Sequence, residues 1–243
     1  MKFDRIISLV PSQSELLWDL GLREELIGIT KFCIHPNEMF KSVTRIGGTK
    51  TLDLEKIRAL KPDLIIANKE ENEKEQIEAL QKEFKVHVTE VYTLEDSYQM
   101  IGEVGEMVGR KEKSLALVED IKTEFAKLKQ PANPKRVVYF IWKSPYMVAG
   151  KNTIIDDLLK QAGYINAIED ARYPEITLEK VKELNPDYVF LSSEPFPFTD
   201  KHKAEFDFLP VENVKIVDGE MFSWYGSRLL KAPDYFTALG ATL

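Results

Sequence analysis

The sequence contains a single cysteine and no long apolar run, and each of these absences excludes a class of protein. Cys33 is the only cysteine among 243 residues, so the chain can form no internal disulfide and its cysteine usage gives no sign of an oxidising compartment. No apolar stretch approaches the roughly 18 residues that a membrane span requires. We therefore expect a globular protein without a transmembrane helix.

The N-terminus lacks the features of a secretory leader. The segment MKFDRIISLVPS enters an apolar strand pattern directly, without a basic stretch, a signal core or a small-residue cleavage site. Taken alone, this start fits a cytoplasmic protein or a protein whose leader has been removed.

Basic residues are too few for a surface that binds nucleic acid. The chain has 33 lysines and arginines against 40 aspartates and glutamates, a formal charge of -7 and a pI of about 5.2. A net negative charge opposes sequence-independent binding to phosphate backbones, so we expect no nucleic acid partner.

The residue patterns of common enzymes and metal sites are also missing. The sequence has neither a Walker-type phosphate loop nor a dinucleotide-binding fingerprint, and no serine lies in a nucleophile-elbow pattern. Only three histidines are present, His35, His87 and His202, and no two have the spacing of helical metal ligands. We expect His87 on the solvent side of a strand and His202 solvated within a charged run. The residues therefore predict no enzyme, no resident cofactor and no metal bound by the protein alone.

What the sequence does contain is a regular alternation of short apolar strands and amphipathic helices. β-Branched runs predict strands, and apolar residues at intervals of three or four predict helices. A capping-box spacing from Ser12 to Glu15 marks the expected start of the first helix. The expected strands are residues 6–10, 26–30, 64–67, 86–91, 136–142 and 214–217, and the expected helices include 73–84, 153–162 and 228–239. This alternation indicates α/β lobes with parallel sheets.

One segment departs from the alternation. Residues 94–128 hold two consecutive helical patterns without a strand between them, and the second pattern runs from Lys111 to Leu128. Those roughly 18 residues would span on the order of 27 Å. We therefore predict an N-terminal lobe of residues 1–108, an interdomain backbone helix of residues 109–131 and a C-terminal lobe of residues 132–243.

An internal repeat supports two related lobes. The stretch LDLEKIRALKPDLIIAN, which begins at Leu52, aligns without a gap with ITLEKVKELNPDYVFLSS, which begins at Ile176. The identical pairs are Leu54/Leu178, Glu55/Glu179, Lys56/Lys180, Leu60/Leu184, Pro62/Pro186 and Asp63/Asp187. Each lobe is therefore predicted to contain the same helix-Pro-Asp-strand unit.

Aromatic residues gather where several of the expected strands end. The candidates for ligand contact are Trp142, Tyr146, Tyr173, Trp224 and Tyr225. Ligands of open parallel sheets bind beyond the carboxyl ends of the strands, so we expect these rings to line a cleft between the lobes. Flat rings with a few polar neighbours suit a large and partly apolar ligand. The alternative for each ring is a place in the core of its lobe.

The order of these motifs resembles a known family over essentially the whole chain. The similar segments are RIISLVPSQSELLWDLG, CIHP, GGTKTLDLEKIRALKPDLIIA, a long helix and YPEITLEKVKELNPDYVFLSS. In these segments the chain is similar to the helical-backbone substrate-binding proteins of ABC importers, in their cobalamin and ferric-siderophore branch. The resemblance implies an α/β fold of class III periplasmic binding proteins, in which two Rossmann-like lobes with parallel sheets are joined by a single long α-helix. It implies a ligand in the interlobe cleft, delivery to a membrane ABC permease dimer, and a periplasmic or cell-surface location.

Within this resemblance the expected ligand is a corrinoid, cobalamin or a related compound. His35 occupies the loop in which relatives present a ligand-facing tyrosine, and a neutral imidazole could contact the corrin or bind its cobalt as an axial ligand. The alternative for His35 is a loop histidine bonded to backbone. Tyr173, Trp224 and Tyr225 match ligand-lining positions of the family. One departure is Ile46-Gly47-Gly48, where cobalamin binders can carry a tryptophan.

Other ligands and roles stay open. A ferric siderophore or haem is the alternative ligand, but anionic catecholates require a cluster of cations, and the sequence offers Arg45, Arg172, Arg228 and a few lysines. An intracellular corrinoid carrier or sensor is a different class with the same lobes. An enzyme that works in the cleft is a third, for which the sequence shows no nucleophile-base pair. We expect a monomer.

The resemblance also assigns a role to the acidic residue of each repeated unit. In the family this residue pairs with basic residues of the permease, and the matching positions are Glu55 and Glu179. Two carboxylates on two lobes can engage a symmetric permease dimer, which favours orientation and association rate over raw affinity. The alternative is that both are helix N-terminal acids stabilised by the helix dipole.

Overall fold

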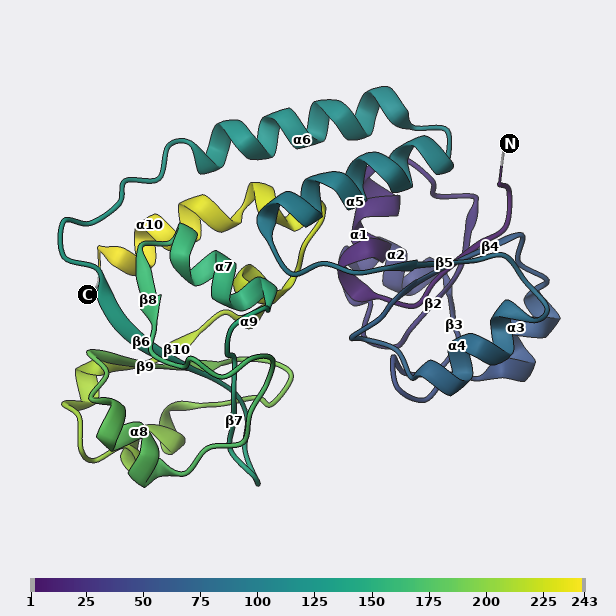
Figure 1. Ribbon diagram of the computed structural model, residues 1–243. Helices are drawn as coiled ribbons and strands as arrows, with labels where there is room; N and C mark the ends of the chain where they lie inside the picture. Colours follow the sequence, from purple (N-terminus) through teal and green to yellow (C-terminus); the bar gives the residue numbers. More distant parts are fainter. Residues whose placement is uncertain (1–2, 242–243) are drawn as a thin grey trace. The chain divides into compact units, whose positions relative to one another are not determined.

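The computed structural model describes residues 3–241 and divides the chain into two α/β units, each with its own sheet (Figure 1). Unit 1 holds residues up to 91, 95–121 and 225–228, and unit 2 holds residues 92–94, 122–224 and 229 onward. The sequence prediction placed the connecting helix, residues 109–131, outside both lobes. In the structure, the residues of that helix are shared between the two units, and the short C-terminal segment 225–228 belongs to unit 1. No helix within residues 3–241 has both the length and the apolar character to cross a membrane.

Unit 1 is built around a parallel sheet of five strands in the order β3-β2-β1-β4-β5. The strands are β1 (Ile6–Ser8), β2 (Leu26–Ile29), β3 (Thr44–Arg45), β4 (Leu64–Asn68) and β5 (Val86–Thr89). Ile7 of the central strand pairs with Gly28 on one side and Ile65 on the other. Strands buried on both faces read as continuous apolar runs, which is why the short runs were recognisable in the sequence.

Helices cover both faces of the unit 1 sheet (Figure 1). Helices α3 (Leu54–Leu60) and α4 (Lys74–Gln81) pack on one face, where their apolar residues join Ile7, Leu9 and Ile65 in one core cluster. Helices α1 (Pro11–Asp19) and α5 (Leu94–Met107) lie on the other face. A short helix, α2 (Asn37–Ser42), follows β2.

Unit 2 has a mixed sheet in which one strand is antiparallel. Its strands are β6 (Lys135–Trp142), β7 (Met147–Val148), β8 (Tyr164–Asn166), β9 (Tyr188–Ser192) and β10 (Val214–Val217). The order is β10-β9-β6, and the far side of β6 pairs with β8 along its first residues and with β7 along its last. Only β7 runs antiparallel, and the other four strands match the predicted parallel arrangement.

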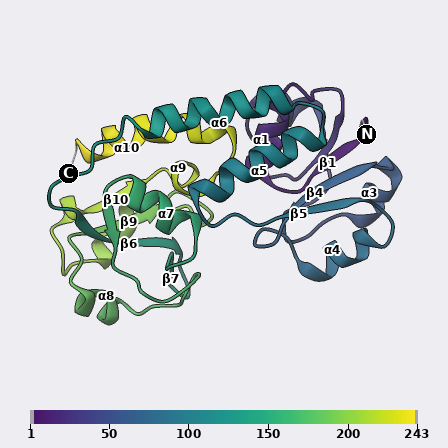
Figure 2. The ribbon, with the colours of Figure 1, turned by 45° about the horizontal axis from the view of Figure 1, so that its top comes forward.

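The two faces of the unit 2 sheet have different cores. Helix α8 (Leu178–Leu184) and the 3-10 helix η1 (Asp200–Glu205) pack on one face over Phe140, Leu191 and Phe206. Helices α7 (Ile154–Gln161), α9 (Gly219–Ser223) and α10 (Ala232–Gly240) cover the other face (Figure 2). That second core is aromatic, with Phe222 in ring contact with Tyr139, Phe190, Tyr235 and Phe236.

Helix α6 (Lys111–Phe125) is continuous over 15 residues, or about 22 Å, three residues shorter than the sequence predicts. Its residues up to Ile121 belong to unit 1 and its last turn to unit 2, where Phe125 meets Phe236 with ring centroids 6.4 Å apart. Gly105 lets α5 approach α6, since a Cβ there would come within 2.0 Å of Ser114 Oγ. Both views show α5 and α6 side by side (Figures 1 and 2).

Two predicted helix boundaries are wrong. Helix α1 begins at Pro11 with Val10 as its N-cap and no side-chain cap, so the residues Ser12 to Glu15 form no capping box and are buried instead. The predicted closing helix of residues 228–239 is two pieces, η3 (Ser227–Leu230) and α10. Pro233 explains the interruption, because proline fits the first turn of a helix and breaks the hydrogen-bond ladder inside one.

The surroundings of two histidines also differ from expectation. His202 is 6% exposed, its Nδ1 accepts a hydrogen bond from the Thr199 N–H at 2.9 Å, and its ring packs against Phe196 and Phe198. The prediction of a solvated His202 is therefore wrong, because the charged residues around it form a 3-10 turn that directs the ring inward. His87 is half-buried, and burial lowers its pKa.

Candidate functional site

The repeated sequence forms a repeated structure. Helices α3 and α8 each have seven residues, and each is capped by a side chain at its N-terminus. Asp53 accepts a hydrogen bond from the Lys56 N–H at 3.0 Å, and Thr177 accepts one from the Lys180 N–H at 3.2 Å. Both helices end in a left-handed residue, with φ 45° and ψ 61° in the first copy and φ 46° and ψ 60° in the second.

The Pro-Asp part of each copy attaches its helix to the sheet. Asp63 accepts a hydrogen bond from the Arg5 N–H at 3.0 Å, and Asp187 accepts one from the Arg136 N–H at 2.8 Å. The side chains of these two arginines donate to the last carbonyl of α3 at 3.1 Å and of α8 at 3.4 Å. Helix ends leave such carbonyls without an intrahelical donor, so each Arg/Asp pair closes its helix and fixes it beside a strand.

This scaffold presents Glu55 and Glu179 in the first turns of equivalent helices, but their surroundings differ. The Glu55 side chain is 87% exposed and lies 2.6 Å from Arg58 Nη1, and Arg58 also pairs with Glu83 at 2.7 Å. Glu179 is exposed and forms no ion pair with any residue that the structure describes. The two acids therefore match in position and differ in how far they are neutralised.

The surfaces beside the two helices carry opposite charge. A hollow of about 320 Å³ next to α3 is lined by Lys41, Arg45 and Lys56. A hollow of about 540 Å³ next to α8 is lined by several carboxylates and one lysine, with an apolar floor; its charged residues are Glu169, Asp170, Glu175 and Lys180. A partner that touched both helices would meet a basic surface at one and an acidic surface at the other.

The carboxyl end of β2 in unit 1 carries exposed apolar side chains. Phe32 is 50% and Ile34 is 45% exposed, and His35 is partly buried next to them. Cys33 anchors the loop from below, with its Sγ 3.1 Å from the hydroxyls of Ser14 and Thr30. Burial raises the pKa of the Cys33 thiol, so this cysteine is an unreactive packing residue.

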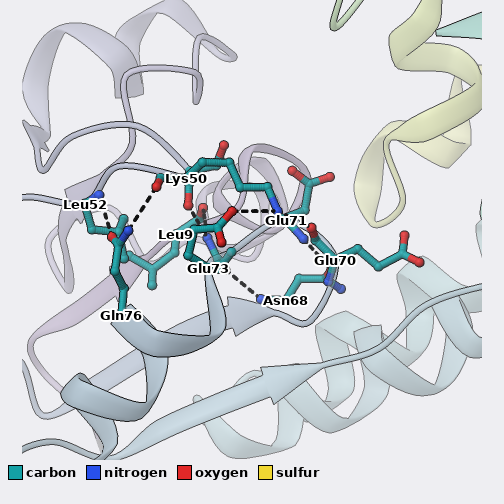
Figure 3. A network of polar contacts seen from close by, with 10 residues as sticks. Leu9, Lys50, Leu52, Asn68, Glu70, Glu71, Glu73 and Gln76 are labelled. Carbon is teal, nitrogen blue, oxygen red and sulfur yellow. Dashed lines mark hydrogen bonds and ion pairs between the residues drawn. The ribbon is translucent and has the colours of Figure 1, made fainter. Parts of the chain in front are cut away.

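The loop after β4 is held by a polar network that the sequence did not predict (Figure 3). Asn68 Oδ1 accepts hydrogen bonds from the N–H groups of Glu70 at 2.9 Å and Glu71 at 3.3 Å. Lys50 Nζ donates to the carbonyl of Glu70 at 2.7 Å and lies 3.5 Å from Glu73. Burial raises the pKa of the Glu71 carboxyl, although the positive charge of Lys50 acts to lower it. These bonds hold the backbone of the loop, which carries Glu70, Glu71 and Glu73 at the carboxyl end of β4.

In unit 2, three predicted rings lie at the end of β6 or in the loops after β6 and β8, and their surroundings differ. Trp142 is 40% exposed and makes an edge contact with Phe196, at 5.8 Å between ring centroids. Tyr173 is partly buried beside the Arg172 guanidinium, 5.8 Å from its ring centroid. Tyr146 is partly buried and packs edge-on against the Phe140 ring of the core.

Two further contacts hold the Tyr146 and Arg172 side chains. The Tyr146 hydroxyl donates to Glu205, which also pairs with Lys143 at 2.5 Å. Arg172 has a left-handed backbone, with φ 70°, and its guanidinium lies 4.8 Å from the ring centroid of Tyr92 and donates to the Asn152 carbonyl at 2.9 Å. Loops with such contacts are fixed platforms rather than mobile flaps.

Trp224 and Tyr225 are neighbours in sequence and belong to different units. Trp224 is 6% exposed, and its Nε1 donates to Glu194 Oε1 at 2.8 Å. Tyr225 is 4% exposed, with its hydroxyl 3.5 Å from Gln13 Nε2. Both predicted ligand contacts are thus largely buried, and Glu194 bonds to Trp224 while Gln13 lies beside Tyr225. Neither Glu194 nor Gln13 lies in a periodic pattern or motif that would have identified it from the sequence.

Two of the arginines that the sequence offered to an anionic ligand are used by unit 1 itself. Arg228 forms a buried two-point ion pair with Glu15, at 2.7 and 2.8 Å, and both side chains are almost fully buried. Arg45 donates to the carbonyls of Phe40 and Val43. Removing one partner of a buried pair leaves an uncompensated charge, so Arg228 is committed to Glu15.

Comparisons with known proteins agree with this architecture. A family model described as periplasmic binding protein matches residues 6–209. The uncharacterized ABC transporter substrate-binding lipoprotein YvrC of Bacillus subtilis is 29% identical over 199 residues, 76% of this chain and 62% of that protein. The vitamin B12-binding protein of Vibrio vulnificus (strain CMCP6) is 30% identical over 196 residues, 78% of this chain and 71% of that protein.

Solved structures share the fold at lower identity. The periplasmic heme-binding protein RhuT from Roseiflexus sp. RS-1, in apo form, aligns with a TM-score of 0.87 at 22% identity and covers 98% of both chains. The periplasmic vitamin B12 binding protein BtuF of Vibrio cholerae aligns with a TM-score of 0.80 at 23% identity, over 99% of this chain and 98% of that one. The predicted α/β fold of two lobes with parallel sheets is confirmed.

Proposed function

The chain belongs to the periplasmic binding protein family, and on that premise we propose that it captures a corrinoid, cobalamin or a related compound, for delivery to a membrane permease. It is a substrate-binding protein of the ABC importer type and not an enzyme. Its partners are accordingly a small-molecule ligand and a membrane permease, and the ligand is cargo rather than a cofactor. We propose that it acts as a monomer.

The observation that carries the corrinoid proposal is the exposure of large apolar side chains at the carboxyl ends of strands in both units. Phe32 and Ile34 follow β2, and Trp142 ends β6; these side chains are 50%, 45% and 40% exposed. Exposed rings and aliphatic groups at the strand ends of each sheet suit a wide, partly apolar ligand such as a corrin. Relatives named vitamin B12-binding protein, at 25% to 30% identity, support the same ligand class.

The proposed ligand contacts are the predicted set: His35, Trp142, Tyr146, Tyr173, Trp224 and Tyr225. His35 has a distinct role among them, because its imidazole can bind the cobalt of a corrinoid as an axial ligand. Trp142 offers the most exposed ring of the set, whereas Trp224 and Tyr225 are only 6% and 4% exposed.

Haem or a ferric siderophore is the second candidate. Haem is favoured by His35, since imidazole binds iron as well as cobalt. A catecholate siderophore is less well supported, because Arg45, Arg228 and Arg172 all donate hydrogen bonds to groups of their own units. A corrinoid carrier or sensor without a transport role would need the same contacts, and only a permease assay separates it from an importer component.

A spectroscopic titration tests the ligand. We expect dicyanocobinamide or cyanocobalamin to bind with a Kd below about 10 μM, and a shift of the visible cobalt bands that is lost in His35→Ala. Trp142→Ala should weaken binding without moving those bands, which makes it the matched control for axial coordination. Failure of both corrinoids to bind at such concentrations contradicts the proposal, and binding of hemin alone favours the second candidate.

We further propose that Glu55 and Glu179 dock the protein on its permease. Their places in the first turns of equivalent helices support a two-point contact, and their exposure leaves both accessible. With a cognate permease in proteoliposomes, Glu55→Ala/Glu179→Ala should abolish transport and leave ligand affinity unchanged. Loss of ligand affinity would instead indicate a structural role for the two acids.

A further inference from the structure

Glu194 lies two residues beyond β9 and holds the side chains that follow the neighbouring strand β10. Its Oε1 accepts a hydrogen bond from Trp224 Nε1 at 2.8 Å and one from Ser223 Oγ at 2.9 Å. Ser223 ends α9, which begins directly after β10. A carboxylate just beyond the end of β9 thus holds an indole that directly follows α9, the short helix after β10. Ligands of parallel sheets bind beyond these strand ends.

The turn that carries Glu194 is itself fixed from the core. Ser192 Oγ donates to the Glu194 carbonyl at 2.5 Å and accepts a hydrogen bond from the Tyr139 hydroxyl at 3.1 Å. Tyr139 and Ser192 are almost completely buried. Gly219 packs against this turn so closely that a Cβ would come within 2.4 Å of Ser192 Oγ and 2.6 Å of Glu194 Cγ. The position of the carboxylate is therefore set by packed neighbours on three elements.

The bond to Glu194 decides which part of Trp224 is available to a ligand. An indole has one donor, its Nε1–H, and no acceptor. That donor already bonds to a carboxylate, and a hydrogen bond to a charged acceptor is stronger than one between neutral groups. A ligand at this position therefore meets the apolar rim of the ring and not its polar atom.

We propose that Glu194 is a positioning residue for ligand binding, which acts by fixing the indole of Trp224 and by saturating its only donor. This inference rests on the proposed function, in which Trp224 contacts the ligand. The substrate class that it favours is a ligand with an apolar or methyl-bearing edge, because a polar edge would find no donor on this ring.

The first test examines the indole without any ligand. The chain has three tryptophans, so protein labelled with ¹⁵N-tryptophan should give three indole N–H signals, and Trp224→Phe assigns one of them. Glu194→Ala should shift that signal and speed its exchange with water, while Glu194→Gln, whose amide oxygen can still accept, should largely restore both. Glu212→Gln removes an exposed carboxylate of the same unit and should leave all three signals unchanged.

The second test measures affinity for cyanocobalamin and dicyanocobinamide. Glu194→Ala and Trp224→Phe should each weaken binding by about tenfold, and the double variant should bind no more weakly than Trp224→Phe alone. Glu194→Gln should stay within about threefold of the wild type. A role in folding alone would lower the thermal midpoint of Glu194→Ala but leave the affinity of the folded protein unchanged. If Glu194→Ala does not fold, Glu194→Asp replaces it, since its shorter side chain moves the carboxylate from the indole.

The results separate this inference from the proposed function. An unchanged Trp224 signal in Glu194→Ala overturns the positioning role, as does a shifted signal together with wild-type affinity. A wild-type protein that binds neither corrinoid contradicts the proposed function, and the positioning role falls with it. A shifted signal, weakened binding and restoration by glutamine together support the inference.

Discussion

Helices α3 and α8 have the same backbone conformation but different surroundings. Both are seven residues long, both are capped by a side chain, and both end in a left-handed residue. Yet Glu55 is paired with Arg58 above a basic hollow, whereas Glu179 lies unpaired, among the residues described, beside an acidic one. The two copies thus keep one backbone even where their residues differ, as at the N-caps Asp53 and Thr177, and other differences change the charge of the two surfaces.

The difference extends to a single aligned position. Arg58 of α3 aligns with Lys182 of α8, and the arginine pairs with two carboxylates, Glu55 and Glu83. Lys182 forms no ion pair with the residues that the structure describes. A guanidinium can bond to two carboxylates at once through its planar array of donors, whereas an ammonium acts as a point charge. The arginine of one copy thus pairs with Glu55, whereas the lysine of the other forms no ion pair with Glu179 among the residues described.

The largest expected difference between the copies concerns docking. With a cognate permease in proteoliposomes, Glu179→Ala should lower transport by about tenfold, and Glu55→Ala by about threefold, because only Glu179 offers an unneutralised charge to basic residues of a partner. Ligand affinity should not change in either variant. Equal losses would show that the bond to Arg58 does not weaken the role of Glu55.

The next difference concerns the Asp residues that attach the helices. Asp63 accepts hydrogen bonds from two backbone N–H groups, those of Asp4 and Arg5, while Asp187 accepts one, from Arg136. Asp63→Ala should therefore lower the free energy of unfolding by about 2 kcal/mol and Asp187→Ala by about 1 kcal/mol, as measured by urea denaturation.

An exposed aspartate provides the control for these two variants. Asp207→Ala should change the free energy of unfolding by less than about 0.5 kcal/mol, as expected for an exposed residue. A cost for Asp187→Ala as large as that for Asp63→Ala would mean that the number of accepted hydrogen bonds does not set the difference.

The N-caps should show how far the copies are equivalent. Asp53→Ala and Thr177→Ala should each cost about 1 kcal/mol of unfolding free energy, because each removes the acceptor for one orphan N–H group. The exchanges Asp53→Thr and Thr177→Asp should each cost less than about 0.5 kcal/mol, since both residue types cap helices well. A large cost for either exchange would show that the two helix starts differ in more than their side chains.

The smallest expected difference between the copies is in how their stability depends on pH. Hydrogen bonding to Arg58 lowers the pKa of Glu83 from its ordinary value of 4.5. A carboxyl with a lowered folded-state pKa stabilises the protein above that ordinary value and loses this contribution as the pH falls through the folded-state pKa. The stability difference between the wild type and Arg58→Ala, followed by thermal denaturation, should therefore shrink below about pH 4.5. Lys182→Ala should show no such trend, and a trend of equal size in both variants would contradict the difference between the copies.

The sequence was sufficient for the lobes and for the repeated unit. Buried parallel strands leave apolar runs, the repeat leaves identical residues at fixed spacing, and β4, β6 and β10 lie within one residue of their expected bounds. The positions of Glu55 and Glu179 on equivalent helices followed from the alignment alone. These features are local, so local patterns carry them.

The rest depends on contacts between distant residues. Glu15 and Arg228 are 213 residues apart, and nothing near either one in sequence indicates a buried pair. Glu194 and Trp224 meet because β9 and β10 are neighbours in the sheet, and the strand order was not predicted. His202 is a different case, because the rings that cover it, Phe196 and Phe198, are near it in sequence, and the error came from its charged neighbours, which suggested solvent.

The central claim is that the exposed rings at the strand ends bind a corrinoid, and calorimetric titration tests it most directly. The wild-type protein would be titrated with cyanocobalamin, dicyanocobinamide and hemin under the same conditions. We predict that one corrinoid binds at one molecule per chain with a Kd below about 10 μM and with a negative heat-capacity change, as expected when apolar surface is buried. Binding of hemin without measurable binding of either corrinoid would contradict the account.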